Sequence, residues 1–210
     1  MEQSPYILTY SNKQFHFLSD DVSEVDINDI AKALSQVNRY TGHTKMPYSV
    51  AEHSVHVASL LPPEYQLAGL LHDASEAYLN DISSPLKSLL PDYRAIEETV
   101  QNKILRHFGV TAEHMEDAEK HVKYADITLY FSELYNINPE EYAISKQNIP
   151  ECDIFNKIEE SPTLKLLPFF IPNTIAEGVF RKAFRMISNG IYLTQPFTSQ
   201  ADMTSFLLKR

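Results

Sequence analysis

The sequence predicts a mainly α-helical protein, built as a helical bundle with a small N-terminal β-hairpin. Apolar residues recur at three- and four-residue spacing along much of the chain, which is typical of helices that bury one face. Serine, threonine and aspartate residues stand just before several of these stretches, where their side chains can cap a helix. Only five glycines occur against twelve prolines. No Gly-rich phosphate-binding loop is present, which excludes P-loop and dinucleotide-binding folds.

The first elements follow from alternation and from capping signals. Residues 6–18 alternate between apolar and polar side chains around a short polar turn, which predicts a β-hairpin. A helix is expected to begin after Asp26, its N-cap, and to run to about residue 38. The stretch that starts at Ser49 matches a capping box, so a second helix is expected to begin there and to end at Pro62-Pro63.

The rest of the chain is expected to be helical as well, with one irregular stretch. Further helices are expected over 64–79, 92–108, 111–135, where Thr111 is the expected N-cap, and 174–188. Residues 136–172 contain five prolines and are expected to be irregular, with room for one short helix. From residue 191 onward the chain is expected to form an extended arm. Residues 136–210 would then be a C-terminal helical extension of a single domain that spans 1–210.

Composition and charge exclude several classes of function. The chain has 18 basic residues against 28 acidic ones, which gives a net charge of −10. An acidic surface repels a phosphate backbone, so no nucleic-acid partner is expected. A small anionic substrate can still bind where a cation occupies the site.

The chain has features that are typical of a cytoplasmic protein. Cys152 is the single cysteine, so no intramolecular disulfide can form, which fits a reducing compartment. The first residues lack a basic region followed by an apolar run, and no segment reaches the roughly 18 unbroken apolar residues of a membrane span. We therefore expect a cytoplasmic location and no membrane partner.

A candidate metal site begins with His72 and Asp73, which are adjacent in an otherwise apolar stretch that is expected to be a buried helix. Burying an imidazole and a carboxylate without partners is costly, and a divalent cation can bind both at once. His53 lies eight residues before the end of the helix that is expected to begin at Ser49. His72 lies eight residues into the helix that is expected over 64–79. If these helices form an antiparallel hairpin around Pro62-Pro63, both histidines stand about 12 Å from the turn.

Asp126, on the expected long helix, completes a set of two imidazoles and two carboxylates. Such a set favours one divalent ion of Mn, Co, Ni, Fe or Mg over the thiolate-bound zinc of a structural site. We therefore predict a metal site formed by His53, His72, Asp73 and Asp126. From the residues alone, a plain structural role for these side chains is an equally good interpretation.

Several motifs around these residues resemble the HD-domain metal-dependent phosphohydrolases. The resemblance is to the subgroup of bacterial 5′-deoxynucleotidases and phage deoxynucleotide (dATP-type) triphosphohydrolases, and it spans about residues 26–135. The motifs are Asn38-Arg39-Tyr40, Tyr48-Ser49-Val50-Ala51-Glu52-His53-Ser54, His72-Asp73-Ala74-Ser75-Glu76-Ala77-Tyr78, Asp81 and Pro85-Leu86-Lys87. The resemblance implies an HD-domain helical bundle with its metal-binding core in this range, and with the four residues named above as ligands.

Glu76 and Asp81 are the candidate catalytic residues. Glu76 lies one helical turn after His72 and therefore on the same side as the metal ligands, where it can act as a general acid or base or can support a ligand. The resemblance implies the catalytic role for Glu76. It also implies a role for Asp81 near the leaving group, the attacking water and the sugar. The alternative is that Asp81 is an ordinary turn residue at a helix end.

Arg39, Tyr40 and Lys87 are the candidate substrate-binding residues. A guanidinium group pairs with phosphate oxygens through two hydrogen bonds, so Arg39 can hold the phosphate of a substrate. The alternative is that Arg39 only offsets the dipole at the end of the first helix. The resemblance places an aromatic residue beside this arginine, which Tyr40 matches in type. Lys87 is a second candidate for phosphate binding.

The resemblance implies a metal-dependent hydrolase of 2′-deoxynucleotides, of the 5′-deoxynucleotidase type, which releases a deoxynucleoside and phosphate. Cleavage of deoxynucleoside triphosphates to nucleoside and triphosphate is the main alternative within the class. Cleavage of another phosphate ester and a non-catalytic nucleotide-sensing module are further alternatives. We expect a homo-oligomer, dimeric or larger, in the cytoplasm of a bacterium or of a phage-infected host cell.

Overall fold

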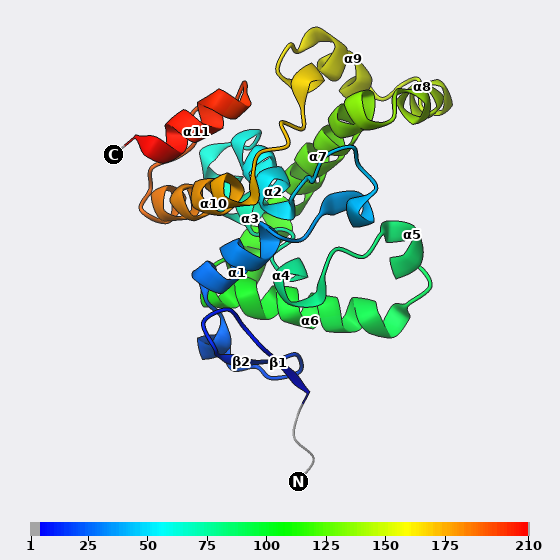
Figure 1. Ribbon diagram of the computed structural model, residues 1–210. Coiled ribbons are helices and arrows are strands. Elements are labelled where there is room, and N and C mark those ends of the chain that lie inside the picture. Colours follow the sequence, from blue (N-terminus) through cyan, green and yellow to red (C-terminus); the bar gives the residue numbers. More distant parts are fainter. Residues whose placement is uncertain (1–4, 210) are drawn as a thin grey trace.

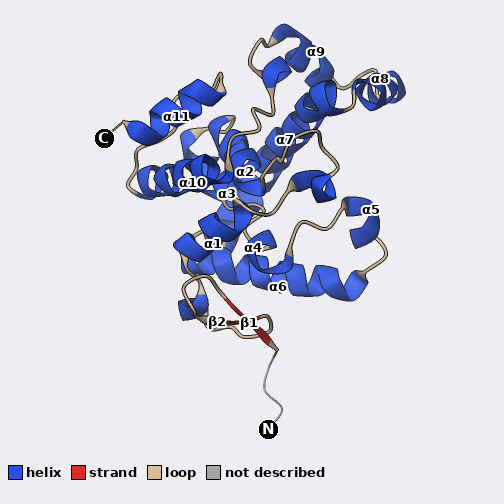
Figure 2. Cartoon of the chain, viewed as in Figure 1, coloured by secondary structure: helices blue, strands red, loops and turns tan. Residues whose placement is uncertain are grey.

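Helices make up most of the structure, a computed structural model that describes residues 5–209 (Figure 1, Figure 2). The predicted fold class, mainly α-helical with an N-terminal β-hairpin, is confirmed. The α-helices in the described range are α1 (Ile27–Leu34), α2 (Val50–Ser59), α3 (Gln66–Leu70), α4 (Glu76–Leu79), α5 (Ser84–Lys87), α6 (Pro91–His107), α7 (Ala112–Ile137), α8 (Pro139–Asn148), α9 (Asp153–Glu160), α10 (Asn173–Ser188) and α11 (Gln200–Leu208). The 3₁₀ helices are η1 (Val22–Glu24), η2 (Arg39–Gly42), η3 (Pro63–Tyr65) and η4 (Leu164–Leu166). None of the helices in residues 5–209 combines the length and the apolar character that a membrane crossing requires.

The predicted hairpin consists of β1 (Tyr6–Leu8) and β2 (Gln14–His16), which pair antiparallel. Phe15 on β2 is fully buried and stacks on Tyr78 of α4, with 3.7 Å between the ring centroids. The Lys103 ammonium of α6 lies 4.3 Å from the centroid of the same phenylalanine ring. The hairpin therefore packs against α4 and α6 and closes that end of the bundle (Figure 1).

α2 is the central helix of the bundle, and all ten of its residues are buried. α3, α7 and α10 pack around it (Figure 1). Most of its residues are alanine, valine and serine, whose small side chains let neighbouring helices approach closely. His53 lies in the middle of this helix and is removed from water, where a polar atom without a partner is costly.

The predicted N-caps of three helices are confirmed. The side chains of Asp26, Ser49 and Thr111 each accept a hydrogen bond from a backbone N–H group two or three residues further on. These bonds satisfy N–H groups that have no partner within the helix, and they define where α1, α2 and α7 begin. The starts of α2 and α7, which carry His53 and Asp126, are therefore local features of the sequence.

α1 ends at Leu34 rather than near residue 38 as predicted. Beyond it, Asn38 forms an antiparallel bridge with Ser49, and the Arg39 N–H group donates to the Tyr48 carbonyl at 2.9 Å. The segment before α2 satisfies these backbone groups in place of a longer helix. This pairing holds Arg39 next to the N-terminus of α2.

The single helix predicted over 64–79 is wrong, since the chain forms turns at 71–75 between α3 and α4. Gln101 of α6 holds this interruption. Its side-chain amide donates to the Leu71 carbonyl at 2.7 Å and accepts from the Ser75 N–H group at 3.0 Å. A side chain from another helix thus satisfies backbone groups that a continuous helix would pair internally. Two of the predicted metal ligands lie within these turns.

Two predictions for the C-terminal third are corrected. Residues 136–172 form two helices, α8 and α9, rather than one short helix. The predicted extended arm beyond 191 ends in α11, whose N-cap Ser199 accepts a hydrogen bond three residues on. α11 packs on α10 (Figure 1), where a Cβ atom added to Gly178 would lie 2.9 Å from Leu207 Cδ1. The last segment therefore folds back and packs closely against α10.

Candidate metal centre

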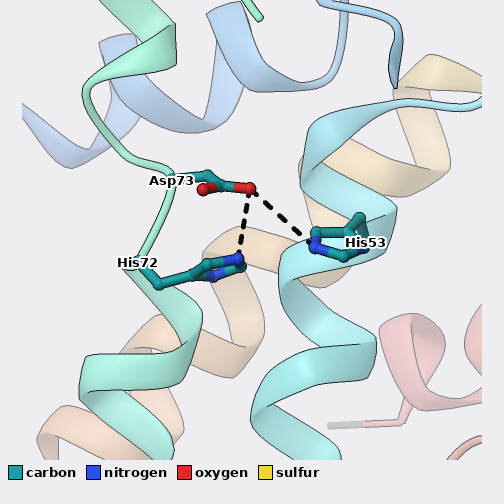
Figure 3. Close-up of side chains that lie close together, drawn as sticks. All are labelled: His53, His72 and Asp73. Carbon is teal, nitrogen blue, oxygen red and sulfur yellow. Dashed lines mark ion pairs between the residues drawn. The ribbon is translucent and has the colours of Figure 1, made fainter. Parts of the chain in front are cut away.

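Three elements bring the predicted metal ligands together. His53 comes from α2, Asp126 from α7, and the pair His72 and Asp73 from the turns between α3 and α4. His72 Nε2 lies 3.1 Å from Asp73 Oδ2, and His53 Nε2 lies 3.8 Å from the same oxygen. Figure 3 shows both rings and the Asp73 carboxylate directed toward one another. One ligand atom from each of these three residues lies within 4.8 Å of the others.

Asp126 lies beside this group of three, close to both imidazoles. Its Oδ1 atom lies 3.0 Å from His53 Nε2 and 3.8 Å from His72 Nε2. A carboxylate oxygen on α7 is therefore within reach of both imidazoles, as the prediction requires. His53 and Asp126 are 73 positions apart in the sequence, so it is the packing of α7 on α2 and α3 that brings them together.

The hydrogen bonds of the two histidines define which ring nitrogen faces the site. His53 Nδ1 lies 2.8 Å from Glu133 Oε1, and His72 Nδ1 lies 2.8 Å from the Gly69 carbonyl oxygen. Both partners are acceptors, so each Nδ1 carries a proton, and in the neutral form of each ring Nε2 presents its lone pair. Both Nε2 atoms are buried and have no hydrogen-bond partner within the described residues; the 3.0 Å approach of Asp126 lacks hydrogen-bond geometry.

This arrangement fits a divalent metal ion. The polar atoms beside the two Nε2 lone pairs are carboxylate oxygens of Asp73 and Asp126, which are acceptors as well. Acceptors gathered at one point repel one another unless a cation lies between them. Two imidazole nitrogens and two carboxylate oxygens suit the ions named above, Mn, Co, Ni, Fe or Mg. The residues present can therefore hold the predicted cofactor.

In the metal-free protein, the charges of the site favour bound cations. Burial raises the pKa of Asp73, but the His72 and His53 imidazoles outweigh burial and lower it to about 2. Burial lowers the pKa of His72, but Asp73 and Asp126 outweigh it and raise this pKa well above its usual value. The carboxylates therefore stay ionised and attract positive charge, either protons on the imidazoles or a metal ion.

The sequence patterns do not point to Glu133 of α7, yet it connects most of the site. Glu133 is fully buried and accepts hydrogen bonds from Arg39, from His53 and from two tyrosine hydroxyl groups. Burial raises the pKa of Glu133, but Arg39 and His53 outweigh burial and lower it to about 2. One signal exists in the sequence: Glu133 lies seven residues after Asp126, which is two helical turns further along the same face.

Arg39 lies beside the predicted metal ligands, five residues beyond the end of α1. Its Nη2 atom is 3.2 Å from Glu133 Oε2, and its Nη1 atom is 3.8 Å from Asp73 Oδ2. The next residues, Tyr40 and Thr41, have φ angles of 57° and 51°. This left-handed conformation is unfavourable for residues other than glycine. Neighbouring contacts hold this turn, above all the Tyr40 hydroxyl, which donates to Glu133 Oε2 at 2.5 Å.

Glu76, the candidate general acid or base, is 4% exposed at the start of α4. Burial raises the pKa of Glu76 well above its usual value, and Asp73 and Asp81 add to this effect. Its Oε2 atom has no hydrogen-bond partner in the described part of the chain, and Lys87 Nζ lies 3.6 Å from Oε1. The same Lys87 ammonium lies 2.6 Å from Glu97 Oε1, so a bound phosphate would share it with a carboxylate.

Asp81 belongs to the same group of charges. Burial raises its pKa, and Arg39 opposes this rise. The preceding residue, Asn80, has φ 65° and ψ 161°, a combination that residues other than glycine rarely adopt. The Tyr93 hydroxyl holds this turn by donating to the Asn80 carbonyl at 3.2 Å. Strain of this kind is common where a side chain must be directed into a functional site.

A cavity of about 250 Å³ opens beside two of the metal ligands. Its lining comes from the turns at 71–75, from α5 and from α6, and each lining residue has a polar or charged side chain. The lining residues are His72, Asp73, Ser75, Lys87, Arg94, Glu97, Glu98 and Gln101. A larger groove of about 720 Å³, between α6 and α7, has none of the predicted site residues on its wall. The smaller cavity is therefore the one that suits a charged ligand of the candidate metal site.

The sequence is similar to two bacterial proteins. It is 36% identical over 159 residues to the uncharacterized protein YfdR of Escherichia coli (strain K12), and the alignment covers 75% of this chain and 87% of YfdR. It is 31% identical over 126 residues to an uncharacterized protein of Rhodobacter capsulatus, which covers 55% of this chain and 64% of that protein. No family model matches the chain. The names of these relatives state no activity, so function has to be inferred from the chemistry of the site.

Proposed function

We propose that this chain, which belongs to the protein family of Escherichia coli YfdR, is a metal-dependent phosphohydrolase of the HD-domain type. Its proposed substrate is a 2′-deoxynucleoside 5′-monophosphate, which is hydrolysed to a deoxynucleoside and phosphate. The observation that carries the proposal is the meeting of two imidazole Nε2 atoms, two carboxylates and an arginine side chain. Such a set can bind a metal ion and an anion side by side.

A phosphate ester fits both parts of this site. A divalent ion supplies Lewis-acid polarisation of a phosphate oxygen and lowers the pKa of a water molecule that it binds. Arg39 lies 3.8 Å from Asp73, and its hydrogen bonds to Glu133 hold it in place. The guanidinium N–H groups not used by Glu133 can pair with phosphate oxygens and offset the negative charge that builds up during phosphoryl transfer.

Glu76 and Asp81 are proposed to move protons during hydrolysis. The pKa of each carboxyl group is raised, chiefly by burial. A carboxyl group in this state can donate a proton to the leaving 5′ oxygen or take one from the attacking water at a pH closer to neutral. The restriction to 2′-deoxynucleotides rests on the resemblance of the motifs around Arg39 and Glu76, and a comparison of dAMP with AMP tests it.

Cleavage of deoxynucleoside triphosphates is a second candidate, favoured by the cavity beside His72 and Asp73. Lys87 and Arg94 stand on its wall, where cationic side chains can bind phosphates beyond the one that is attacked. Attack at the α-phosphorus releases the deoxynucleoside from either substrate. The two activities therefore differ in the second product, which is orthophosphate in one case and triphosphate in the other.

A substrate panel with product identification tests both candidates. Purified protein is incubated with Mn²⁺ or Co²⁺ and with each of the four deoxynucleoside monophosphates, AMP and dATP, and the products are separated by ion-exchange chromatography. Orthophosphate from the deoxynucleoside monophosphates supports the proposal, and triphosphate from dATP supports the second candidate. If the metal-loaded protein hydrolyses none of these compounds, the proposed function is wrong.

His72→Ala is expected to lose the metal ion and the activity together, because it removes one of the two imidazole ligands. Elemental analysis after dialysis should find one metal ion per chain in the unmodified protein and none in the variant. His107→Ala is the matched control, since His107 is exposed at the end of α6, and it should keep both metal and activity. A metal-loaded His72→Ala protein would contradict the ligand assignment.

A further inference from the structure

We infer that Glu133 is a positioning residue whose single carboxylate orients both the metal ligand His53 and the phosphate-binding Arg39. The inference rests on the proposed function for the role of Arg39, but its test measures metal binding without a nucleotide. It assigns a purpose to a fully buried charge beside the site that is neither a predicted metal ligand nor a predicted proton-transfer residue.

The two oxygens of Glu133 serve two different halves of the site. Oε1 accepts from His53 Nδ1 at 2.8 Å and from the Tyr48 hydroxyl at 2.7 Å. Oε2 accepts from the Tyr40 hydroxyl at 2.5 Å and from Arg39 Nη2 and Nε at 3.2 and 3.3 Å. The metal ligand is thus on one oxygen, and the candidate phosphate-binding residue is on the other.

A purely structural carboxylate would not need this division. Burying an ionised carboxylate is costly, and a close partner such as Arg39 can offset that cost. Glu133 instead has donors on both oxygens, and they come from α2, from η2 and from the segment before α2. A network in which every member is satisfied allows little rotation of any side chain in it. The ring of His53 and the guanidinium of Arg39 therefore keep fixed orientations relative to each other.

The contact with His53 also determines which nitrogen can bind metal. Because Glu133 Oε1 can only accept a hydrogen bond, it keeps the proton on Nδ1 and leaves the lone pair of Nε2 directed at Asp126 and Asp73. A histidine that binds metal through one nitrogen commonly donates its other N–H group to a carboxylate, and loss of that carboxylate weakens metal binding about 10- to 100-fold.

Glu133→Gln separates the two halves because an amide has one acceptor oxygen and one donor NH₂ group. Arg39 keeps its N–H groups protonated at every accessible pH, so the amide oxygen should remain on the Arg39 side. The NH₂ group then faces His53 Nδ1, which favours the tautomer that accepts there and carries its proton on Nε2. That tautomer cannot bind a metal ion through Nε2.

The experiment is a titration of metal-free protein with Mn²⁺ by calorimetry. Glu133→Gln is expected to bind Mn²⁺ at least about 10-fold more weakly than the unmodified protein. Tyr48→Phe is the matched control: it removes one hydrogen bond to the same oxygen but keeps the carboxylate and the His53 contact, so its affinity should change by no more than about threefold. Ser132→Ala removes a neighbouring buried hydrogen bond to the Leu164 carbonyl and controls for a general loss of stability.

A folded Glu133→Gln protein that binds Mn²⁺ within about threefold of the unmodified protein would overturn the inference, as would an equal loss of affinity in Ser132→Ala. A second measurement covers the case in which Glu133→Gln does not fold. In the unmodified protein loaded with Zn²⁺, ¹⁵N NMR should find His53 protonated at Nδ1 and metal-bound at Nε2, and the reverse would overturn the inference. If the protein hydrolyses none of the nucleotides in the substrate panel, these binding results still stand. Only the role of Arg39 in catalysis is then removed.

Discussion

Two buried glutamates lie in the candidate site, and their surroundings have opposite effects. Donors reach both oxygens of Glu133, and its pKa is lowered to about 2. Glu76 is nearly as buried, but one of its oxygens has no partner within the described residues and its pKa is raised. One carboxylate is thus kept ionised and fixes its neighbours, while the other is in a state from which a proton can move. The difference teaches that neighbouring charges and hydrogen-bond donors, and not burial alone, decide the charge of a carboxyl group.

The largest expected effect concerns catalysis. Glu76→Gln should lower kcat by about 10²- to 10⁴-fold, the usual contribution of a general acid or base, and should leave metal binding intact because Glu76 is not a ligand. Initial rates at saturating dAMP and elemental analysis of the same preparation measure the two quantities. Loss of metal from Glu76→Gln, or a rate within tenfold of that of the unmodified protein, would contradict the proton-transfer role that distinguishes Glu76 from Glu133.

The next effect concerns stability. Glu133→Ala should lower the free energy of unfolding by about 3–5 kcal/mol, because it leaves Arg39 and its other donors buried without a partner. Glu76→Ala should cost less than about 1 kcal/mol, since it removes a carboxyl group that is itself poorly paired. Urea denaturation of the metal-free variants compares them directly. Similar losses of unfolding free energy in the two variants would show that the hydrogen bonds of Glu133 add nothing to the stability of the protein.

The raised pKa of Glu76 predicts a pH effect with a definite sign. Above the ordinary glutamate value of 4.5, the unfolded chain releases this proton while the folded chain still holds it. The folded state then binds more protons, so stability falls as pH rises until the folded-state pKa is reached. Between pH 5 and pH 7, Glu76→Gln should remove a slope of at most about 1.4 kcal/mol per pH unit. Urea denaturation at several pH values measures it, and parallel curves for the two proteins would contradict the prediction.

The smallest expected effect concerns the strained turn before Asp81. Asn80→Gly should raise the free energy of unfolding by about 1 kcal/mol, because glycine adopts its φ of 65° and ψ of 161° without steric cost. Asn189→Gly is the control, since Asn189 has φ −101° and no strain to relieve. Thermal and urea denaturation of both variants measure the difference. A loss of stability at position 80 would mean that the Asn80 side chain contributes more than its backbone strain costs.

Local signals predicted the parts of the fold that depend on neighbouring residues. The N-caps Asp26, Ser49 and Thr111 were readable because a cap is a hydrogen bond between residues two or three positions apart. The interruption at 71–75 was not readable, because it depends on the side chain of Gln101, about thirty residues further on. The final helix, α11, was missed although its N-cap Ser199 is a local signal of the same kind, and only the tertiary structure shows that it packs on α10.

The candidate site shows the same division between residue type and spatial arrangement. Residue types and spacing were enough to name four candidate ligands, because imidazole and carboxylate groups in apolar helices need a cationic partner. The structure gathers three of them, His53, His72 and Asp73, into one group that could hold a metal ion. The tautomer of His53, the different pKa shifts of the two buried glutamates and the position of Arg39 all depend on contacts across the fold. Arg39 and Glu133 are 94 positions apart, and a pKa or a tautomer responds to the atoms that surround a group in space, whatever their distance along the chain.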